Sequence, residues 1–242
     1  MAESLVPTTG WGVLHLFCKP TPFADAQAVV AAVKRLEADD HQAVTVALLG
    51  HKADAAFMAL GPDLVRLRRF QSELTTAGLD VVDSYVSLTE VSEYAQEVPE
   101  AMKQVRLYPK LPPEGRRAWC FYPMTKRRDV DQNWYVLPYD ERKELMLEHG
   151  QTGKLFHRRV LQLVTGSTGL DDWEWGVTLF AVHPDDLKEC VHRMRFDQAS
   201  ARYAEFGPFY AGIVTPIEEL IVEVGIGPSN ESLHSAGRIT DS

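Results

Sequence analysis

The chain has 242 residues, of which 45% are hydrophobic, and it carries a formal net charge of −9. A chain of this length and composition can bury a sizeable core, either as one large domain or as two fused smaller ones. The acidic balance argues against general nucleic-acid binding, because that function needs a basic surface to displace the counterions of phosphate.

The first half of the chain shows alternating strand and helix patterns. Apolar runs bounded by turn residues indicate strands, and apolar residues spaced by three and four indicate amphipathic helices. The expected elements are a strand at 11–18, a helix at 24–38, strands at 43–50 and 55–60, a helix at 62–78 and a strand at 80–90. This β-α-β-β-α-β order is that of the ferredoxin-like fold.

The second half repeats this order. Its expected elements are a strand at 118–123, a helix at 139–150, strands at 160–166 and 173–182, a helix at 183–196 and a closing strand or strands within 206–224. We therefore predict an α+β fold of two duplicated ferredoxin-like halves, residues 10–100 and 101–225, whose sheets pack into a shared dimeric α+β barrel. The polar residues 226–242 are expected to form a disordered tail.

The three cysteines, Cys18, Cys120 and Cys190, are widely spaced and lack the C-x-x-C spacing of a metal site. They are expected to be reduced thiols in a cytoplasmic protein. The N-terminus lacks the basic-then-apolar pattern of a signal peptide, and no apolar run approaches the roughly 18 residues of a membrane span. We therefore expect a protein without a membrane span.

His149 stands near the expected end of a helix that begins after Pro138 and stops at Gly150. Leu145 and Met146 precede it by four and three residues, so the three side chains share one helix face. The pattern has two interpretations: a buried imidazole satisfied by the backbone, or a single axial ligand to a haem iron inside an apolar shell. A zinc site is not expected, because no second ligand stands at a suitable spacing.

The stretch "AWCFYPMTKRR" (118–128) is an apolar strand that ends in three consecutive cations. Tyr122 and Lys126 stand four residues apart at its end. A phenol can donate a hydrogen bond, act as an acid or relay a radical. An ammonium group beside it favours an anionic ligand.

Three long runs of the second half match a known family in order: "RLYPKLPPEGRRAWCFYPMTKRRDVDQNWYVLPYDERKELMLEHG" (106–150), "VLQLVTGSTGLDDWEWGVTLFAV" (160–182) and "MRFDQASARYAEFGPFY" (194–210). They closely resemble the coproheme decarboxylases, the haem-synthesising branch of the chlorite dismutase family. The resemblance implies duplicated ferredoxin-like halves, in agreement with the element order, and a homopentamer.

The resemblance also implies an activity. It is the hydrogen-peroxide-dependent oxidative decarboxylation of two propionates of Fe-coproporphyrin III (coproheme) to vinyls, which gives haem b through a monovinyl intermediate. Coproheme is then both substrate and redox cofactor, haem b is the product, and hydrogen peroxide is the oxidant. A transient contact with the upstream ferrochelatase is implied as well.

Position by position, the resemblance assigns roles to residues of this chain. His149, in "LEHG", matches the axial ligand of the iron. Tyr122 matches a tyrosine that is oxidised and takes a hydrogen atom from a propionate, and Lys126 matches a lysine that interacts with the propionate and helps with proton transfer. The other matching positions hold propionates or line the pocket; they are Arg106, Pro123, Met124, Thr125, Gln162 (on the distal side) and Ser200.

One part of the pattern departs from the relatives. Ala118 and Trp119 stand where some members carry a histidine-containing pair, and His157 is interpreted as a surface helix residue rather than a distal base. The distal acid-base group is therefore left open.

Two other functions stay open on the same residues. The first is a chlorite dismutase or a haem peroxidase on the same fold. Chlorite-degrading relatives place an arginine where Gln162 stands, and a neutral amide lacks the fixed charge that would hold an anionic oxidant. The second is a haem carrier or sensor without turnover, which would leave a redox tyrosine near Lys126 unexplained.

Overall fold

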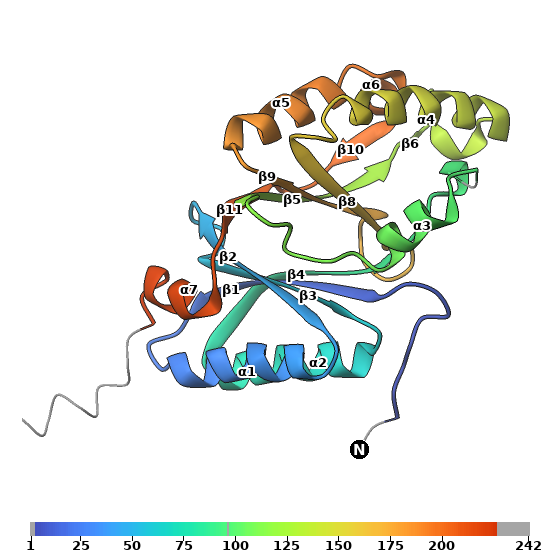
Figure 1. Ribbon diagram of the computed structural model, residues 1–242. Helices are drawn as coiled ribbons and strands as arrows, with labels where there is room; N and C mark the ends of the chain where they lie inside the picture. The colour runs from blue at the N-terminus through green and yellow to red at the C-terminus, as the bar shows by residue number, and fades with distance from the viewer. Residues whose placement is uncertain (1–2, 96, 227–242) are drawn as a thin grey trace, which may run out of the picture.

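Figure 1 shows the computed structural model, which describes residues 3–95 and 97–226. Apart from Ile226, the tail expected over 226–242 lies outside the described residues. Within the described part of the chain, no helix combines the length and the apolar character needed to cross a bilayer.

The strands form one antiparallel barrel. They run in the order β10-β5-β11-β2-β3-β1-β4-β8-β9, and β9 pairs back with β5, which closes the sheet. The short β10 pairs with the end of β5, beyond the residues that pair with β11. The bounds are β1 (Gly12–Pro20), β2 (Gln42–Leu49), β3 (Ala55–Gly61), β4 (Leu79–Thr89), β5 (Ala118–Lys126), β8 (Val160–Gly166), β9 (Trp175–Ala181), β10 (Ala204–Phe206) and β11 (Tyr210–Val214).

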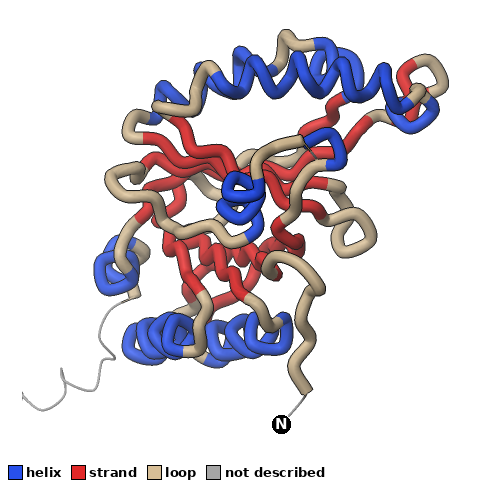
Figure 2. The backbone as a smooth tube through the Cα atoms, turned by 45° about the vertical axis from the view of Figure 1, so that its right-hand side comes forward, coloured by secondary structure: helices blue, strands red, loops and turns tan. Residues whose placement is uncertain are grey.

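Helices cover the barrel from outside in two layers, with the strands between them (Figure 2). One layer lies on the strands of the first half and consists of α1 (Ala26–Ala38), α2 (Leu64–Thr76) and α7 (Ile217–Glu223). The other layer lies on the second half and consists of α4 (Tyr139–Lys154), α5 (Pro184–Met194) and α6 (Gln198–Tyr203). The connections carry η1 (Glu93–Ala95), α3 (Glu100–Leu107), β6 (Arg128–Asp129), β7 (Gln132–Asn133) and η2 (Trp134–Val136).

The two halves have the predicted element order. The first half is β1-α1-β2-β3-α2-β4, and the second contains β5, α4, β8, β9, α5 and β11 in the same sequence of element types. The halves join where β4 pairs with β8 and where β11 pairs with β2. The α+β class with duplicated halves is confirmed, whereas the domain boundaries stay a prediction.

Two expected boundaries were wrong. Helix α4 does not stop at Gly150 but continues to Lys154. A glycine inside a helix costs only about 1 kcal/mol relative to alanine, and α4 continues through Gly150 along its contacts with α5 and α6.

The end of the expected closing strand is also wrong, because residues 217–223 form helix α7. Ile217 and Leu220 are buried and Ile221 packs beside them, which is the three-and-four spacing of a helix. Pro216 precedes the helix, and Glu218 and Glu219 occupy its first turn, as helix starts favour. The β-branched residues of this run favour a strand in isolation, but its buried face is that of a helix.

Successive side chains of β5 point alternately into the barrel and towards the helices outside it. Trp119 and Phe121 point inward, into a core that also contains Phe17, Phe180 and Tyr210. The residues between them, Cys120 and Tyr122, point outward and pack beneath α5. Strand β5 therefore presents Tyr122 to the helix layer of the second half.

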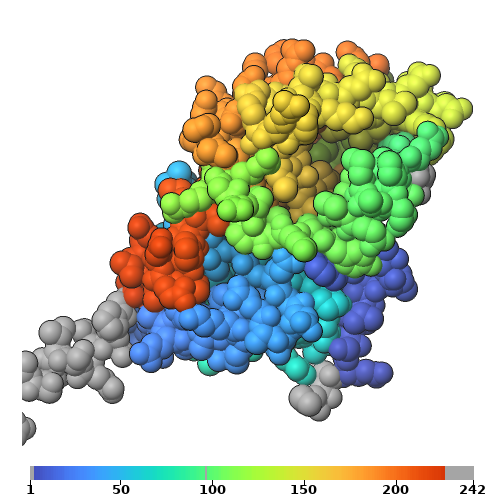
Figure 3. Space-filling view, viewed as in Figure 1, coloured from blue at the N-terminus to red at the C-terminus, as the bar shows by residue number. Residues whose placement is uncertain are grey.

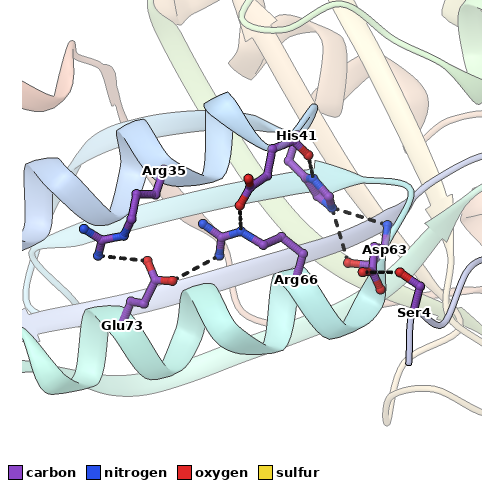
Figure 4. A network of polar contacts seen from close by, with 7 residues as sticks. Ser4, Arg35, His41, Asp63, Arg66 and Glu73 are labelled. Carbon is purple, nitrogen blue, oxygen red and sulfur yellow. Dashed lines mark hydrogen bonds and ion pairs between the residues drawn. The ribbon is translucent and has the colours of Figure 1, made fainter. Parts of the chain in front are cut away.

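An ionic network fastens α1 to α2 on the opposite side of the barrel (Figure 4). Arg66 is buried, and its Nε lies 2.5 Å from Asp39 Oδ2, while its Nη1 lies 3.4 Å from Glu73 Oε1. Arg35 binds the other oxygen of Glu73 at 3.1 Å. Further hydrogen bonds join His41, Asp63 and Ser4 to this side of the molecule. The network is structural and lies far from the residues predicted to be functional.

His15 is fully buried inside the barrel. Its Nε2 lies 3.1 Å from Thr178 Oγ1, its ring centroid lies 4.2 Å from that of Phe121, and its Nδ1 has no partner among the described residues. Burial lowers the pKa of His15 to about 3. The folded protein therefore holds this imidazole neutral.

This histidine should make folding sensitive to acid. Between pH 6.5 and about pH 3, the unfolded chain binds a proton at His15 that the folded chain does not bind. The free energy of unfolding is therefore unaffected by this group above pH 6.5 and decreases as the pH falls below that value. At about 1.4 kcal/mol per pKa unit, acidification to pH 4 should cost about 3 kcal/mol. In denaturant unfolding, the free energy of unfolding of His15→Phe should fall less steeply with decreasing pH than that of the wild type. The control His157→Gln, at an exposed position, should show the wild-type pH dependence. Equal slopes for all three proteins would contradict this role of His15.

Candidate active site

His149 lies in the third turn of α4, where its ring meets the start of α6. Its Nδ1 lies 3.1 Å from Asp197 Oδ2, and the Asp197 side chain is only 1% exposed. Asp197 is the N-cap of α6 and accepts hydrogen bonds from the backbone N–H of Ser200 at 2.9 Å and from its hydroxyl at 3.1 Å. Burial would raise the pKa of Asp197, but the bond and charge of His149 and the bonds from Ser200 outweigh it and lower the pKa. The ionised carboxylate therefore fixes the proton of His149 on Nδ1.

This pair leaves Nε2 of His149 with its lone pair available. No hydrogen bond to Nε2 is found within residues 3–95 and 97–226, and the side chain is 29% exposed. No group of three or more His, Cys, Asp or Glu residues that could hold a metal ion lies in the same described part. A single histidine backed by a carboxylate fits one axial position of a metal that brings its own equatorial ligands, as a porphyrin does.

Helix α4 also lacks the burial that a helix of its length normally has. None of its 16 residues is buried within the described protein. Leu145 and Met146 pack partly against Trp134 and α6, as their shared face with His149 predicted, and the main contacts of the helix are with α5, α6 and η1 rather than with the strands. Figure 3 shows a hollow between α4 and the α3 segment, above β8. The helix thus stands away from the sheet and leaves room beneath it.

Gln162 and Val164 mark the strand side of this space. Gln162 lies on the outer face of β8, and its Nε2 donates to the carbonyl oxygen of Gly153 at 3.2 Å. Gly153 is one helical turn beyond His149 on the same face of α4. Val164, two residues along the same strand face, is 44% exposed although it belongs to a central strand. The predicted distal residue therefore lies opposite α4, beside uncovered apolar surface.

Tyr122 is buried in the wall next to this face. Its ring centroid lies 4.4 Å from that of Phe209 and 5.8 Å from that of Phe206. Burial, with smaller contributions from Cys120 and Cys190, raises the pKa of Tyr122. No hydrogen bond to its hydroxyl is found among the described residues. The structure therefore presents a neutral phenol whose O–H is not used to hold the fold.

Lys126 ends β5 on the same face as Tyr122. Its Nζ donates to the carbonyl oxygen of Ala199 at 2.9 Å and lies 4.4 Å from the centroid of the Trp134 ring. Burial lowers the pKa of Lys126 to about 8, and the negative charges of Asp197 and Glu174 oppose that shift. An ammonium with this pKa can exchange a proton near neutral pH.

Tyr122 and Lys126 do not touch each other. Four residues of a strand span about 13 Å, and Tyr122 packs beneath α5 whereas Lys126 packs against α6. A small ligand could not contact both groups, whereas a flat ligand as wide as a porphyrin could reach from one to the other.

The remaining predicted residues are distributed on both faces. Arg106, at the end of α3, is exposed, and no ion pair or hydrogen bond of its side chain is found within the described residues. Met124 lies on the face of Tyr122, whereas Pro123 and Thr125 alternate to the other face, where the Thr125 hydroxyl donates to Glu174 at 2.5 Å. Ser200 lies with His149 and Asp197. The assignment of these residues to a substrate site stays a prediction.

A cavity of about 620 Å³ lies beside Ser200. Its lining includes Ser200, the two rings that contact Tyr122, Arg127 and Arg195, and one carboxylate, Glu205, which lies 3.9 Å from Arg127. Arg195 lies over the Phe206 ring, 4.6 Å from its centroid. Aromatic walls with two cations fit an aromatic ligand that carries carboxylates.

Sequence reasoning missed Arg195 and Asp197. Asp197 could have been found, because an aspartate three residues before Ser200 in "DQAS" is a helix N-cap signal. Its contact with His149 spans 48 residues of sequence, and no pattern predicts that meeting. Nothing in the spacing singles out Arg195 from its neighbouring cations.

Comparisons with known proteins agree with this fold. The family model described as "Chlorite dismutase" matches residues 23–215. A protein of Natronomonas pharaonis named "Putative heme-binding protein" is 44% identical over 199 residues, which are 75% of this chain and 33% of that protein. The chain thus spans about a third of the length of this curated relative.

Solved structures show the same architecture. A heme-binding protein from Thermus thermophilus superposes with a TM-score of 0.80 at 35% identity, over 92% of this chain and 100% of that one. A mutant chlorite dismutase from Candidatus Nitrospira defluvii gives a TM-score of 0.72 at 20% identity, over 90% of this chain and 97% of that one, which shows a shared fold. Because the family model covers most of the sequence, the chain belongs to the chlorite dismutase family.

Proposed function

We propose that the chain binds an iron porphyrin through His149 and catalyses the hydrogen-peroxide-dependent decarboxylation of coproheme to haem b. The observation that carries this proposal is the His149–Asp197 pair. The free Nε2 of His149 belongs to a helix without buried residues, and strand β5 presents the unbonded phenol of Tyr122 to the same helix layer. The heme-binding names of the two more similar relatives support the porphyrin part. The decarboxylase part rests on Tyr122, Lys126 and the resemblance of the surrounding runs.

In this proposal each residue acts on a group of the substrate. Bound iron porphyrin supplies the redox chemistry that draws oxidising equivalents from peroxide. Tyr122 gives up an electron and its hydroxyl proton, and the resulting phenoxyl radical takes a hydrogen atom from the propionate side chain. Lys126 holds a carboxylate of the same porphyrin by charge and, with its pKa of about 8, can exchange a proton with it.

The reaction balances for each propionate. One peroxide is consumed, one carbon dioxide and two waters are released, and two electrons pass from the propionate to the peroxide. Asp197 keeps the His149 ring in one orientation and one tautomer throughout.

The carboxylates of coproheme also need partners, because a buried carboxylate without one is costly. Arg106, Lys126 and Ser200 are proposed to supply them, and Arg195 and Arg127 extend this basic rim at the neighbouring cavity. Gln162 is proposed to lie on the distal side, with Pro123, Met124 and Thr125 in the wall between Tyr122 and Lys126.

Removing the Arg106 side chain tests this arrangement. A charge-assisted hydrogen bond contributes about 1.5–3 kcal/mol, so Arg106→Ala should bind coproheme roughly tenfold more weakly or worse. Haem b should lose less affinity, because it has fewer carboxylates to hold. Titration of the haem-free protein with both porphyrins measures the difference, with the exposed Arg69→Ala on α2 as a matched control. Equal losses for the two porphyrins would argue against a propionate contact.

We further propose that the protein assembles as a homopentamer in the cytoplasm and contacts the upstream ferrochelatase transiently. The family resemblance alone supports these points. Native mass spectrometry of the full chain should give five copies, and a monomer at micromolar concentration would rule the assembly out.

Two other functions can be distinguished from decarboxylation by their products. A chlorite dismutase or peroxidase would leave the propionates of coproheme unchanged, and a carrier or sensor would leave both peroxide and coproheme unchanged. Adding peroxide to the coproheme complex and following the mass of the porphyrin separates these functions. Conversion of two propionates to vinyls supports the decarboxylase.

A further inference from the structure

A buried carboxylate links the end of β5 to the segment that follows it. Glu174 is 5% exposed and lies just before β9. Its Oε2 accepts hydrogen bonds from the Lys126 backbone N–H at 2.9 Å and from the Thr125 hydroxyl at 2.5 Å. Its Oε1 accepts from Arg128 Nη2 at 2.7 Å and from the Tyr135 hydroxyl. All four donors converge on one side chain.

Two of these donors belong to residues 127–137, which we name the strap. The strap leaves the end of β5, turns through the β6–β7 hairpin and passes through η2. Trp134 in η2 is 3% exposed, and its ring is the surface over which the Lys126 ammonium lies. Tyr135, which follows Trp134 directly, donates its hydroxyl hydrogen to Glu174.

The charge state of Glu174 suits this arrangement. Burial would raise its pKa, but the Lys126 N–H, the Thr125 and Tyr135 hydroxyls and the Arg128 charge outweigh that effect and lower it. An ionised carboxylate can accept four hydrogen bonds, whereas a carboxamide can accept only about half as many and brings two donors of its own. Glu174 is therefore suited to a set of four donors and no acceptor.

We propose that Glu174 is a positioning residue for Lys126: one carboxylate oxygen fixes the backbone of Lys126, and the other holds the strap so that Trp134 seats the ammonium group. The proposal rests on the proposed function only in giving Lys126 a propionate to meet. The position of the Lys126 side chain is a property of the haem-free protein, so it can be tested without any reaction. No hydrogen bond or ion pair joins Glu174 to His149 or to Tyr122 among the described residues, so Glu174 acts through Lys126.

The position of the Lys126 side chain can be measured directly in the haem-free full chain. An aromatic ring face 4.4 Å from Nζ should displace the NMR signal of the Lys126 ε-methylene upfield from those of exposed lysines. Selective labelling of lysine, with Lys126→Met to identify the signal, gives the readout. Glu174→Gln should move this signal most of the way towards the exposed position. Glu189→Gln, which removes one carboxylate from the surface of α5, should leave it in place.

A second variant covers the case in which Glu174→Gln does not fold. Tyr135→Phe removes one of the four donors and keeps the ring, so it should move the Lys126 signal in the same direction by a smaller amount. An unchanged Lys126 signal in a folded Glu174→Gln protein, or in Tyr135→Phe when the first variant fails, would overturn the proposal.

Turnover then tests whether this position serves the reaction. Glu174→Gln should lower the rate of decarboxylation about tenfold or more in the wild-type background, but by much less in Lys126→Met, because the residue to be positioned is then missing. Equal losses in both backgrounds would reduce Glu174 to a structural residue and overturn the positioning role. If the wild-type chain forms no vinyl at all, the proposed function fails, and the NMR signal alone decides on Glu174.

Discussion

Replacing Tyr122 by phenylalanine is expected to abolish the formation of vinyl groups while coproheme remains bound. The substitution keeps the ring and its stack on Phe209, and it removes only a hydroxyl. That hydroxyl makes no hydrogen bond within the described residues, so the fold should lose less than the roughly 0.5–1.5 kcal/mol of an ordinary hydrogen bond. His149 and the basic rim are unchanged, so the iron should still bind and still react with peroxide. No oxidisable group would then remain beside the propionate, and the porphyrin should be bleached instead.

The experiment adds stoichiometric peroxide to the coproheme complex and follows the products by mass spectrometry. Tyr139→Phe serves as a matched control, because this tyrosine lies on the surface of α4 and is 45% exposed. The control should form haem b at the normal rate. Normal haem b formation by Tyr122→Phe would remove the radical role from this tyrosine.

Replacing His149 by alanine should have the second large effect, on the iron. The change removes one partly exposed side chain from a helix without buried residues, so the fold should survive. The spectrum of a five-coordinate, histidine-bound iron should disappear. Porphyrin affinity should fall on the order of a hundredfold or more, since loss of a partner behind a metal ligand already costs about 10–100-fold.

A graded series sharpens this test. Asp197→Asn keeps the size of the side chain but removes the charge behind His149, so it should weaken binding less than His149→Ala and alter the iron spectrum in the same direction. His157→Ala removes an exposed ring whose hydrogen bond within the described residues goes to the carbonyl of Lys154, and it should change neither porphyrin affinity nor the iron spectrum. An iron spectrum that survives in His149→Ala would show that another residue binds the metal.

The fold could be predicted largely from periodicity. Strands such as β1 and β5 are apolar runs, and helices such as α1 and α5 have apolar stripes, so both β-α-β-β-α-β orders were found. The two wrong boundaries each depended on a single weak local signal. Gly150 is a common stop signal, yet α4 continues through it to Lys154, and the β-branched residues of 217–223 favour a strand, yet they form α7.

The site was harder to predict from the sequence, because its contacts join residues that are far apart in the sequence. The helix face of His149 could be predicted from spacing, and the structure confirms that Leu145 and Met146 share it. The carboxylate behind His149 comes from another helix and could not be predicted. Tyr122 and Lys126 are four positions apart, which suggests closeness in the sequence, but on a strand this spacing separates their Cα atoms by about 13 Å.

The measurement that tests the central claim most directly is the mass of the porphyrin bound to the wild-type chain, before and after stoichiometric peroxide. The account predicts that coproheme loses one carbon dioxide and two hydrogens for each of two propionates, first giving the monovinyl species and then haem b. It predicts the same products for Tyr139→Phe and unconverted or bleached coproheme for Tyr122→Phe. A wild-type complex that consumes peroxide while the porphyrin keeps all its propionates would contradict the account.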